Sequence, residues 1–360
     1  MSDKDLLIER VDSVIPGGDL DARGMFEAIW GMPEQCSAAM LTRVHLPLDY
    51  QRVENVFITG MGASGIGAEL VRALLAPRLE VPVVVNRGYD VPAYVDNRTL
   101  MLVVSYTGDT EETISACSAG LAHGAKVVIV TSGGALEQMA RDSGLPLVCT
   151  FPRDLLPRAA LAYLFFPIIA VLREAELTEG VEGEGELISM LKDKREEYAP
   201  GTESQKNRAK QLAADLYGRL PVIYGSDELS GVAALRWKAQ LTETGKNLAY
   251  QNVFPELSHN EFAGLTYPKE LLSQIHLVLL RDRQDHPRVL RQMEEAKAIL
   301  SDGVAGISEV WAEGHAELVR VFSQIYLGDY VSLYLAILNG VDPSSSDRID
   351  ALWSTLEGTH

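Results

Sequence analysis

The sequence predicts an α/β protein with two doubly wound parallel sheets, and three observations lead to that prediction. Short apolar runs rich in β-branched residues alternate with helical patterns, as in a parallel sheet with crossover helices. The alternation stops near residue 180 and begins again near residue 216. A strand, glycine turn and helix start near residue 56 has a faint copy near residue 223. A chain of 360 residues is long enough for two such domains.

The first half carries five candidate strands. They are expected at residues 55–59, 81–85, 100–104, 126–131 and 146–149. Helical runs lie between most of them, at residues 64–75, 110–123 and 135–143, and a very apolar helix that begins at Pro157 closes this half. Because parallel strands need such crossovers, these elements predict one parallel sheet.

The second half repeats this alternation after a polar connection. Strands are expected at residues 220–224, 249–253, 275–280 and 308–312, and helices at 231–242, 288–300 and 318–339. The predicted organisation is therefore a helical segment (1–44), a first α/β domain (45–180), a connecting helical segment (181–215), a second α/β domain (216–340) and a C-terminal helix (341–360). The second glycine turn carries Asp227 and Glu228, so it is expected to bind anions poorly.

Composition excludes several classes of function. The net charge of −18 argues against nucleic-acid binding. The N-terminus lacks the apolar core of a signal peptide, and the longest apolar stretch, residues 159–172, is too short to span a bilayer. The three cysteines are widely spaced and odd in number, which indicates buried thiols in a reducing cytoplasm. No pair of histidines has metal-ligand spacing, so no metal is expected.

Two loops in the first half predict a phosphate site. Gly60-Met61-Gly62-Ala63-Ser64-Gly65 follows a strand and opens a helix, so unpaired N–H groups and the positive helix end face the turn. The hydroxyls of Ser105, Thr107 and Thr110 follow the third strand, where ligands bind in open parallel sheets. Together these groups suit the three terminal oxygens of a phosphate monoester. An ordinary turn at Thr107 and an N-cap at Thr110 remain the alternative.

Three further residues could carry chemistry. Arg158 begins a very apolar helix, where it could lie at the surface or aim its guanidinium into the cleft. Glu243 lies in the last turn of a helix, where a carboxylate is electrostatically unfavourable, which hints at use as a base. His259 is the one histidine among other catalytic residue types in a strand-end loop. The alternative for Glu243 is an ordinary solvated glutamate at a helix end.

These motifs resemble a known family. They are Gly60–Gly65, Ser105–Thr113, Pro157–Ala160, Glu243 and Pro255–Asn260, with Met32-Pro33-Glu34-Gln35 in the preamble. In this order they resemble the bifunctional phosphoglucose/phosphomannose isomerases, over nearly the whole chain. The resemblance implies two tandem, flavodoxin-like sugar-isomerase (SIS) domains without a cofactor.

The resemblance also implies roles for residues. Ser64, Ser105, Thr107 and Thr110 would hold a sugar phosphate with the Gly62 turn. Arg158 would stabilise an enediolate, and Glu243 would move a proton between C1 and C2. His259 would assist ring opening and reach the site of a partner subunit in a homodimer with shared active sites. Ser346 falls where the family leaves room for either C2 epimer.

The chain departs from the family pattern at three positions. Ala63 stands where a third glycine is usual, and Asp109 where asparagine is usual. Asp109 would be uncomfortable beside a phosphate unless it points away. Trp353 replaces an expected lysine, which leaves ring opening to His259 or to Arg348 and makes reduced activity or another phosphosugar possible.

The residue types themselves suit aldose–ketose isomerisation, and two other functions remain open. Isomerisation of glucose 6-phosphate or mannose 6-phosphate to fructose 6-phosphate through a cis-enediol needs a base, an acid and a positive group, but no metal or redox cofactor. An NAD(P)-dependent oxidoreductase would also use G-x-G-x-x-G, although Asn86 and Arg87 stand where that fingerprint wants an acid. A non-catalytic or differently specific phosphosugar-binding protein is the other alternative.

Overall fold

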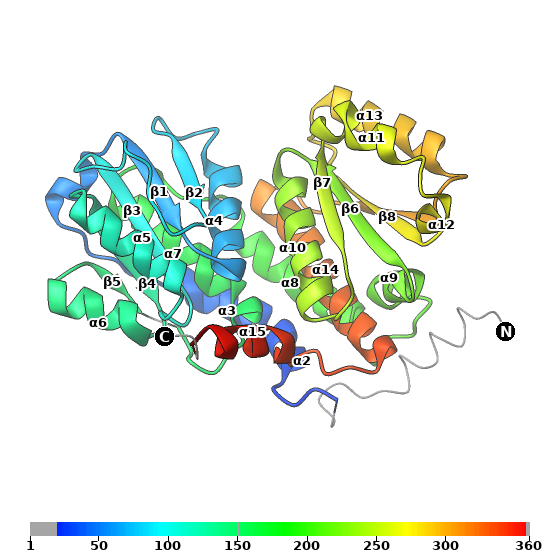
Figure 1. Ribbon diagram of the computed structural model, residues 1–360, viewed down its shortest axis with the longest axis horizontal. Coiled ribbons are helices and arrows are strands. Elements are labelled where there is room, and N and C mark those ends of the chain that lie inside the picture. The colour runs from blue at the N-terminus through cyan, green and yellow to red at the C-terminus, as the bar shows by residue number, and fades with distance from the viewer. Residues whose placement is uncertain (1–19, 150, 358–360) are drawn as a thin grey trace.

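The computed structural model describes residues 20–149 and 151–357 and confirms the predicted fold class (Figure 1). Two separate parallel sheets lie side by side, with strand orders β2-β1-β3-β4-β5 and β7-β6-β8-β9. The strands are β1 (Asn55–Thr59), β2 (Val83–Asn86), β3 (Thr99–Ser105), β4 (Lys126–Thr131), β5 (Leu147–Val148), β6 (Leu220–Ser226), β7 (Tyr250–Phe254), β8 (Ile275–Arg281) and β9 (Gly306–Trp311). Every strand pair is parallel, as the apolar runs and crossovers predicted.

Helices surround both sheets. In the first half they are α2 (Met25–Trp30), α3 (Met32–Met40), α4 (Gly62–Leu75), α5 (Glu111–Ala122), α6 (Gly134–Ser143) and α7 (Leu161–Glu174), with short 3₁₀ helices η1 (Leu48–Gln51) and η2 (Pro157–Ala159). The rest are α8 (Glu184–Glu197), α9 (Arg208–Leu216), α10 (Leu229–Glu243), η3 (Glu256–His259), α11 (Glu261–Gly264), α12 (Lys269–Leu272), α13 (Pro287–Leu300), α14 (Glu317–Asn339) and α15 (Asp347–Glu357).

Each sheet has a switch point beside its first strand in the chain, where strand addition changes from one side of that strand to the other. The chain leaves β1, forms α4 and pairs β2 on one side of β1, and then crosses to place β3 on the other side. In the second sheet β6 is flanked in the same way by β7 and β8. The faint internal repeat in the sequence therefore corresponds to two copies of one topology. The carboxyl ends of β1 and β3 meet at the first switch point, which is where a ligand is expected.

One apolar core joins the two halves through α14. Trp237 of α10 is fully buried against α14 and donates from Nε1 to the Gln324 carbonyl at 2.8 Å. A Cβ at Gly328 would lie 2.3 Å from that Nε1, so only glycine lets the helices approach this closely. Among the described residues α14 is the one helix long and apolar enough to cross a membrane, and its apolar window is entirely buried inside the protein. Its composition is that of a core helix.

The second and fifth strands of the first sheet differ from the prediction. β2 begins at Val83 rather than at residue 81, and β5 is only two residues long. Both are edge strands with a single neighbour, so pairing limits their length more than their apolar pattern does. The predicted connecting segment forms two helices, α8 and α9, which pack on α14 and belong to the shared core.

Candidate active site

The first switch point forms a cradle of backbone N–H groups. Helix α4 begins at Gly62, which has φ of +50°, and no side chain caps this helix end. A Cβ at Gly60 would lie 2.9 Å from the Val104 carbonyl, so this residue must be glycine for β1 and β3 to meet here. Ser64 lies in the first turn and is buried. The helix end is therefore open to an anion, with Ser64 beside it.

The loop after β3 orders its own hydroxyls. Ser105 is buried, and its Oγ lies 3.0 Å from Oγ1 of Thr110 and accepts from the N–H of Gly108 at 3.1 Å. Thr107 is exposed, and its Oγ1 accepts from the N–H of Asp109 at 3.3 Å. Thr110 precedes α5 without a side-chain cap bond, so its hydroxyl pairs with Ser105 and is not an N-cap. The structure thus brings Ser105 and Thr110 together at this switch point.

Asp109 points away from this loop toward a neighbouring helix. Its Oδ1 accepts from the N–H of Ala135 at 2.8 Å, in the first turn of α6. The carboxylate thus satisfies the positive end of α6. This geometry answers the objection that an aspartate would repel a phosphate here, because its charge is taken up by another helix.

Arg158 is buried and holds the C-terminal part of the chain. Its side chain is 5% exposed, so the surface position considered from the sequence is wrong. It donates to the carbonyls of Pro343 at 2.8 Å and Ser345 at 3.2 Å, and from Nη1 to Oγ of Ser346 at 3.2 Å. Burial lowers the pKa of its guanidinium, while the neighbouring Glu243 carboxylate acts in the opposite direction.

A buried ion pair fixes Arg158 relative to α10. Arg236 of α10 donates to the backbone carbonyl of Arg158 at 2.7 Å. The same guanidinium binds both oxygens of Asp329 on α14, at 3.0 and 2.9 Å, and both side chains are 1% exposed. A bidentate pair of this kind holds its partners in one geometry. The segment that carries Arg158 is therefore locked to the helix that ends at Glu243.

Glu243 is the last residue of α10 and is half-buried. The C-terminal end of the helix lies close to Arg158 and to Lys246, whose charges both interact with Glu243. The sequence pattern does not single out Lys246. Its one signal is the spacing of Glu243 and Lys246, an acid and a base three residues apart, which is common on helices.

His259 lies at the other end of the second sheet. Helix α10 starts after the carboxyl end of β6 and runs back to the amino end of the sheet, where Glu243 lies. The exposed His259 follows the carboxyl end of β7, on η3. Since α10 has 15 residues, its two ends are about 20 Å apart, with Glu243 at the end far from the carboxyl ends of the strands. One chain therefore does not bring His259 and Glu243 into the same site.

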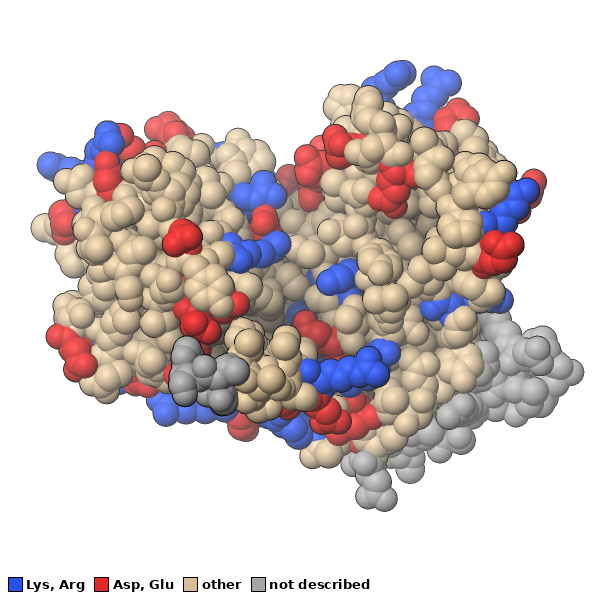
Figure 2. Space-filling view, in the orientation of Figure 1, with Lys and Arg blue, Asp and Glu red and all other residues tan. Residues whose placement is uncertain are grey.

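The C-terminal helix α15 crosses the gap between the two halves (Figure 1). Figure 2 shows the surface hollowed beside it, with both basic and acidic side chains along the hollow. Ser346 comes immediately before α15, and Trp353 lies on it with 38% of its side chain exposed. Arg158, Glu243 and Ser346 thus meet where both halves and α15 come together.

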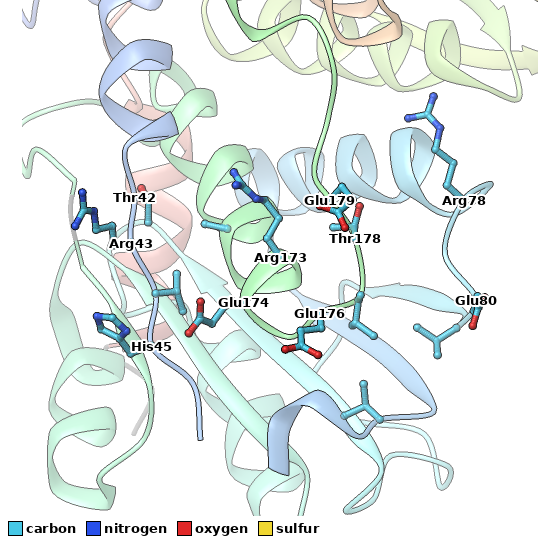
Figure 3. A pocket seen from close by; sticks show the side chains of 15 residues that line it. Thr42, Arg43, His45, Arg78, Glu80, Arg173, Glu174, Glu176, Thr178 and Glu179 are labelled. Atoms are coloured by element: carbon cyan, nitrogen blue, oxygen red, sulfur yellow. The ribbon is translucent and has the colours of Figure 1, made fainter. Parts of the chain in front are cut away.

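A large cavity lies elsewhere. It has a volume of about 1120 Å³, and Figure 3 shows Arg43, His45 and Arg173 around it together with several glutamates. The described residues that line it include none of the candidates above. Basic and acidic side chains alternate around it, so it has no clear preference for an anion. Within residues 20–149 and 151–357 no group of His, Cys, Asp or Glu could hold a metal ion.

The second switch point is closed by side chains. Oγ of Ser226 donates to Oδ1 of Asp285 at 2.7 Å and lies 2.9 Å from Oγ of Ser230. Asp285 is 4% exposed, and burial, with Asp282 and Glu228 nearby, raises its pKa to about 6. A buried carboxyl group therefore lies beside the turn between β6 and α10. The expectation that this turn is a poor anion site agrees with this geometry.

Asp285 makes stability depend on pH. Its folded-state pKa of about 6 lies above the unfolded value, so its contribution is most favourable below about pH 4 and is lost as pH rises through 6. Asp285→Asn keeps a group that can accept from Asp282 and donate to Ser226. It should raise the free energy of unfolding by about 1–2 kcal/mol at pH 8 and by much less at pH 4.5. Urea unfolding at both pH values checks this, with exposed Asp227→Asn as control; an equal effect at both would contradict it.

The fold defines a class, an α/β protein whose two parallel sheets correspond to tandem SIS domains. Residues 205–356 match the bacterial phospho-glucose isomerase C-terminal SIS domain. The chain belongs to the bifunctional phosphoglucose/phosphomannose isomerase family, which makes it an isomerase by family.

Two relatives show this membership, and one solved structure shows the fold. The Caldicellulosiruptor bescii bifunctional phosphoglucose/phosphomannose isomerase is 41% identical over 92% of this chain and 98% of its own length. The Aquifex aeolicus protein of the same name is 32% identical over 86% of this chain and 92% of its own length. A hypothetical protein from Thermus thermophilus has the same fold, with a TM-score of 0.72 at 15% identity, over 99% of this chain and 95% of that one.

Proposed function

We propose that the protein interconverts glucose 6-phosphate, and mannose 6-phosphate, with fructose 6-phosphate through a cis-enediol without a metal. The proposal is supported by the packing of η2, which carries the buried Arg158, against α4, whose first turn has no side-chain cap, and by the charge interaction between Arg158 and Glu243. In the cytoplasm such a reaction serves glycolysis and gluconeogenesis.

The phosphate group would occupy the cradle at the start of α4. Backbone N–H groups near Gly62 and the hydroxyls of Ser64, Ser105, Thr107 and Thr110 would donate to its oxygens. This set of donors explains how a chain with a net charge of −18 can bind a dianion. Binding the end of the sugar that does not react would hold C1 and C2 at a fixed distance from the cradle.

Proton transfer would fall to Glu243. Its carboxylate would remove the proton from C2 of the open aldose, and the same proton would return to C1 to give the ketose, while the proton of the C2 hydroxyl moves to O1. Arg158 would stabilise the negative enediolate oxygen formed between these steps. The intermediate is planar at C2, so one base can serve both C2 epimers. Ser346, bonded to Arg158, would lie where the C2 hydroxyl differs between them.

His259 would act in the site of a second subunit. Its exposed position at the opposite end of the second sheet from Glu243 suits a residue that works in trans. An acid or base at the ring oxygen would open the sugar before isomerisation. The proposed assembly is therefore a homodimer with shared active sites.

The oxidoreductase alternative is weaker on one observation. Arg87, the residue best suited to a nucleotide phosphate, donates to the Gly65 carbonyl at 3.2 Å and lies 3.6 Å from Glu69. Its guanidinium is engaged with α4 rather than left for a ligand.

A coupled assay tests the proposed function. Purified protein with fructose 6-phosphate should produce glucose 6-phosphate, read through a dehydrogenase specific for that product, at the same rate with and without excess chelator. Mannose 6-phosphate as the starting sugar tests the second activity. Tight phosphosugar binding without turnover would favour a non-catalytic sensor, and loss of rate with chelator would contradict metal independence.

A further inference from the structure

Lys246 links the C-terminal segment to the end of α10. Its Nζ donates to the carbonyl of Glu243 and, at 2.7 Å, to that of Ser345. The Ser345 carbonyl also accepts from Arg158 at 3.2 Å. Two cations from different parts of the chain therefore share one carbonyl of residues 343–346, which we call the C-terminal strap.

The backbone of Lys246 is in an unfavourable conformation. Its φ is +51°, in the left-handed region where glycine is usual after a helix, and only one other described non-glycine residue has a positive φ. The neighbouring glycine stands one residue earlier, because a Cβ at Gly245 would lie 2.7 Å from the Leu241 carbonyl. A lysine is thus kept where the backbone favours glycine, which suggests that its side chain is needed.

The surroundings of the ammonium group are those of the proposed site. Charges facing it are Arg158 from η2, Glu243 from α10, and Asp342 and Asp347 from the C-terminal segment. Partial burial, reinforced by Arg158, lowers the pKa of the Lys246 amine. Without this lysine the side chain of Arg158 and the N–H of Arg23, which donates to Oγ of Ser344 at 3.2 Å, would hold the strap, and Lys246 would no longer tie it to the end of α10.

We infer that Lys246 is a positioning residue, which clamps the strap to the end of α10 so that Ser346 and Arg158 face Glu243 across the substrate. This inference rests on the proposed function. With the clamp in place, the guanidinium of Arg158 keeps its orientation when it donates a hydrogen bond to an enediolate oxygen. Without the clamp, the strap and Arg158 can shift together, and a misplaced group costs rate more than binding.

The experiment compares Lys246→Gly with Lys246→Arg. Glycine adopts a positive φ without strain, so Lys246→Gly should leave the urea midpoint equal or higher. Its kcat should fall about 10-fold or more, with KM changed less than about threefold. Lys246→Arg keeps a cation that can reach the strap and should recover most of the rate. If Lys246 merely ended the helix, Lys246→Gly would be as active as wild type. That result would overturn the inference.

Two further measurements keep the outcome decisive. Lys246→Asn also tolerates the left-handed backbone and replaces the glycine variant if that variant unfolds. Hydrogen exchange of amides in residues 341–357 should become faster in Lys246→Gly and return in Lys246→Arg. Hydrogen exchange can be measured on an inactive protein. An inactive wild type would therefore refute the proposed function, and the exchange rates would still test the clamp. Unchanged exchange in the glycine variant would refute the clamp.

Discussion

Replacing Glu243 with glutamine is expected to lower kcat for fructose 6-phosphate about a thousandfold, while phosphosugar binding stays within about threefold of wild type. Glutamine has nearly the same shape but its amide cannot take a proton from carbon. The phosphate cradle lies on other elements, α4 and the loop after β3, so binding of the phosphate should survive. The change should therefore appear in kcat and hardly in affinity.

The measurement combines the coupled assay with titration of a sugar-alcohol phosphate, which binds but lacks a carbonyl to isomerise. Glu228→Gln is the matched control, because it removes an exposed carboxylate at the other end of the same helix. Its rate should equal that of wild type. A fully active Glu243→Gln variant would show that the base is another group.

Loss of activity in this variant should not come from loss of structure. A carboxylate in the last turn of α10 lies at the negative end of the helix dipole. Replacing it with a neutral amide should therefore raise the free energy of unfolding by about a few tenths of a kcal/mol. The lost attraction to Arg158 and Lys246 acts in the opposite direction. The urea midpoint should therefore stay close to that of wild type.

The fold could be predicted because its signals are local. Each strand is a short β-branched run, and each crossover has a helical period, so the pattern alone indicates parallel sheets. The phosphate loops could be predicted for a related reason. Gly62, Ser64 and Ser105 follow strands directly, and the carboxyl ends of neighbouring parallel strands meet at the same edge.

The remainder of the site depends on contacts between distant parts of the chain. Arg158 and Ser346 are 188 residues apart, and no spacing in the sequence shows that they form a hydrogen bond. The same holds for Lys246 and Ser345, which are 99 residues apart and meet because the end of α14 packs beside the end of α10, where Asn339 donates to the Gly245 carbonyl. Residue types can nominate Arg158 for a site, but whether it is buried is decided by packing.

Asp109 shows a different limit of the sequence. In the sequence, its negative charge beside the hydroxyls of Thr107 and Thr110 argues against phosphate binding there. In the structure, the N–H of Ala135, 26 residues later and in the first turn of α6, donates a hydrogen bond to the Asp109 carboxylate. An unfavourable local pattern can thus be resolved by a tertiary contact.

The second large effect concerns His259. His259→Ala should lower kcat about a hundredfold with the cyclic sugar as substrate, because ring opening loses its acid and base. Its effect should be much smaller with a substrate already in the open-chain form. A loss of equal size with both would indicate that His259 acts at the proton-transfer step instead.

Mixed dimers decide whether His259 works across subunits. Within one chain His259 and Glu243 lie at opposite ends of the second sheet, so the proposed site takes them from different chains. A heterodimer of Glu243→Gln and His259→Ala chains, isolated with two different affinity tags, would have both defects in one site and neither in the other. By the two-fold symmetry of a dimer it should recover about half of the wild-type rate. Sites built within one chain would each keep one defect, and the heterodimer would then be no faster than the His259→Ala homodimer.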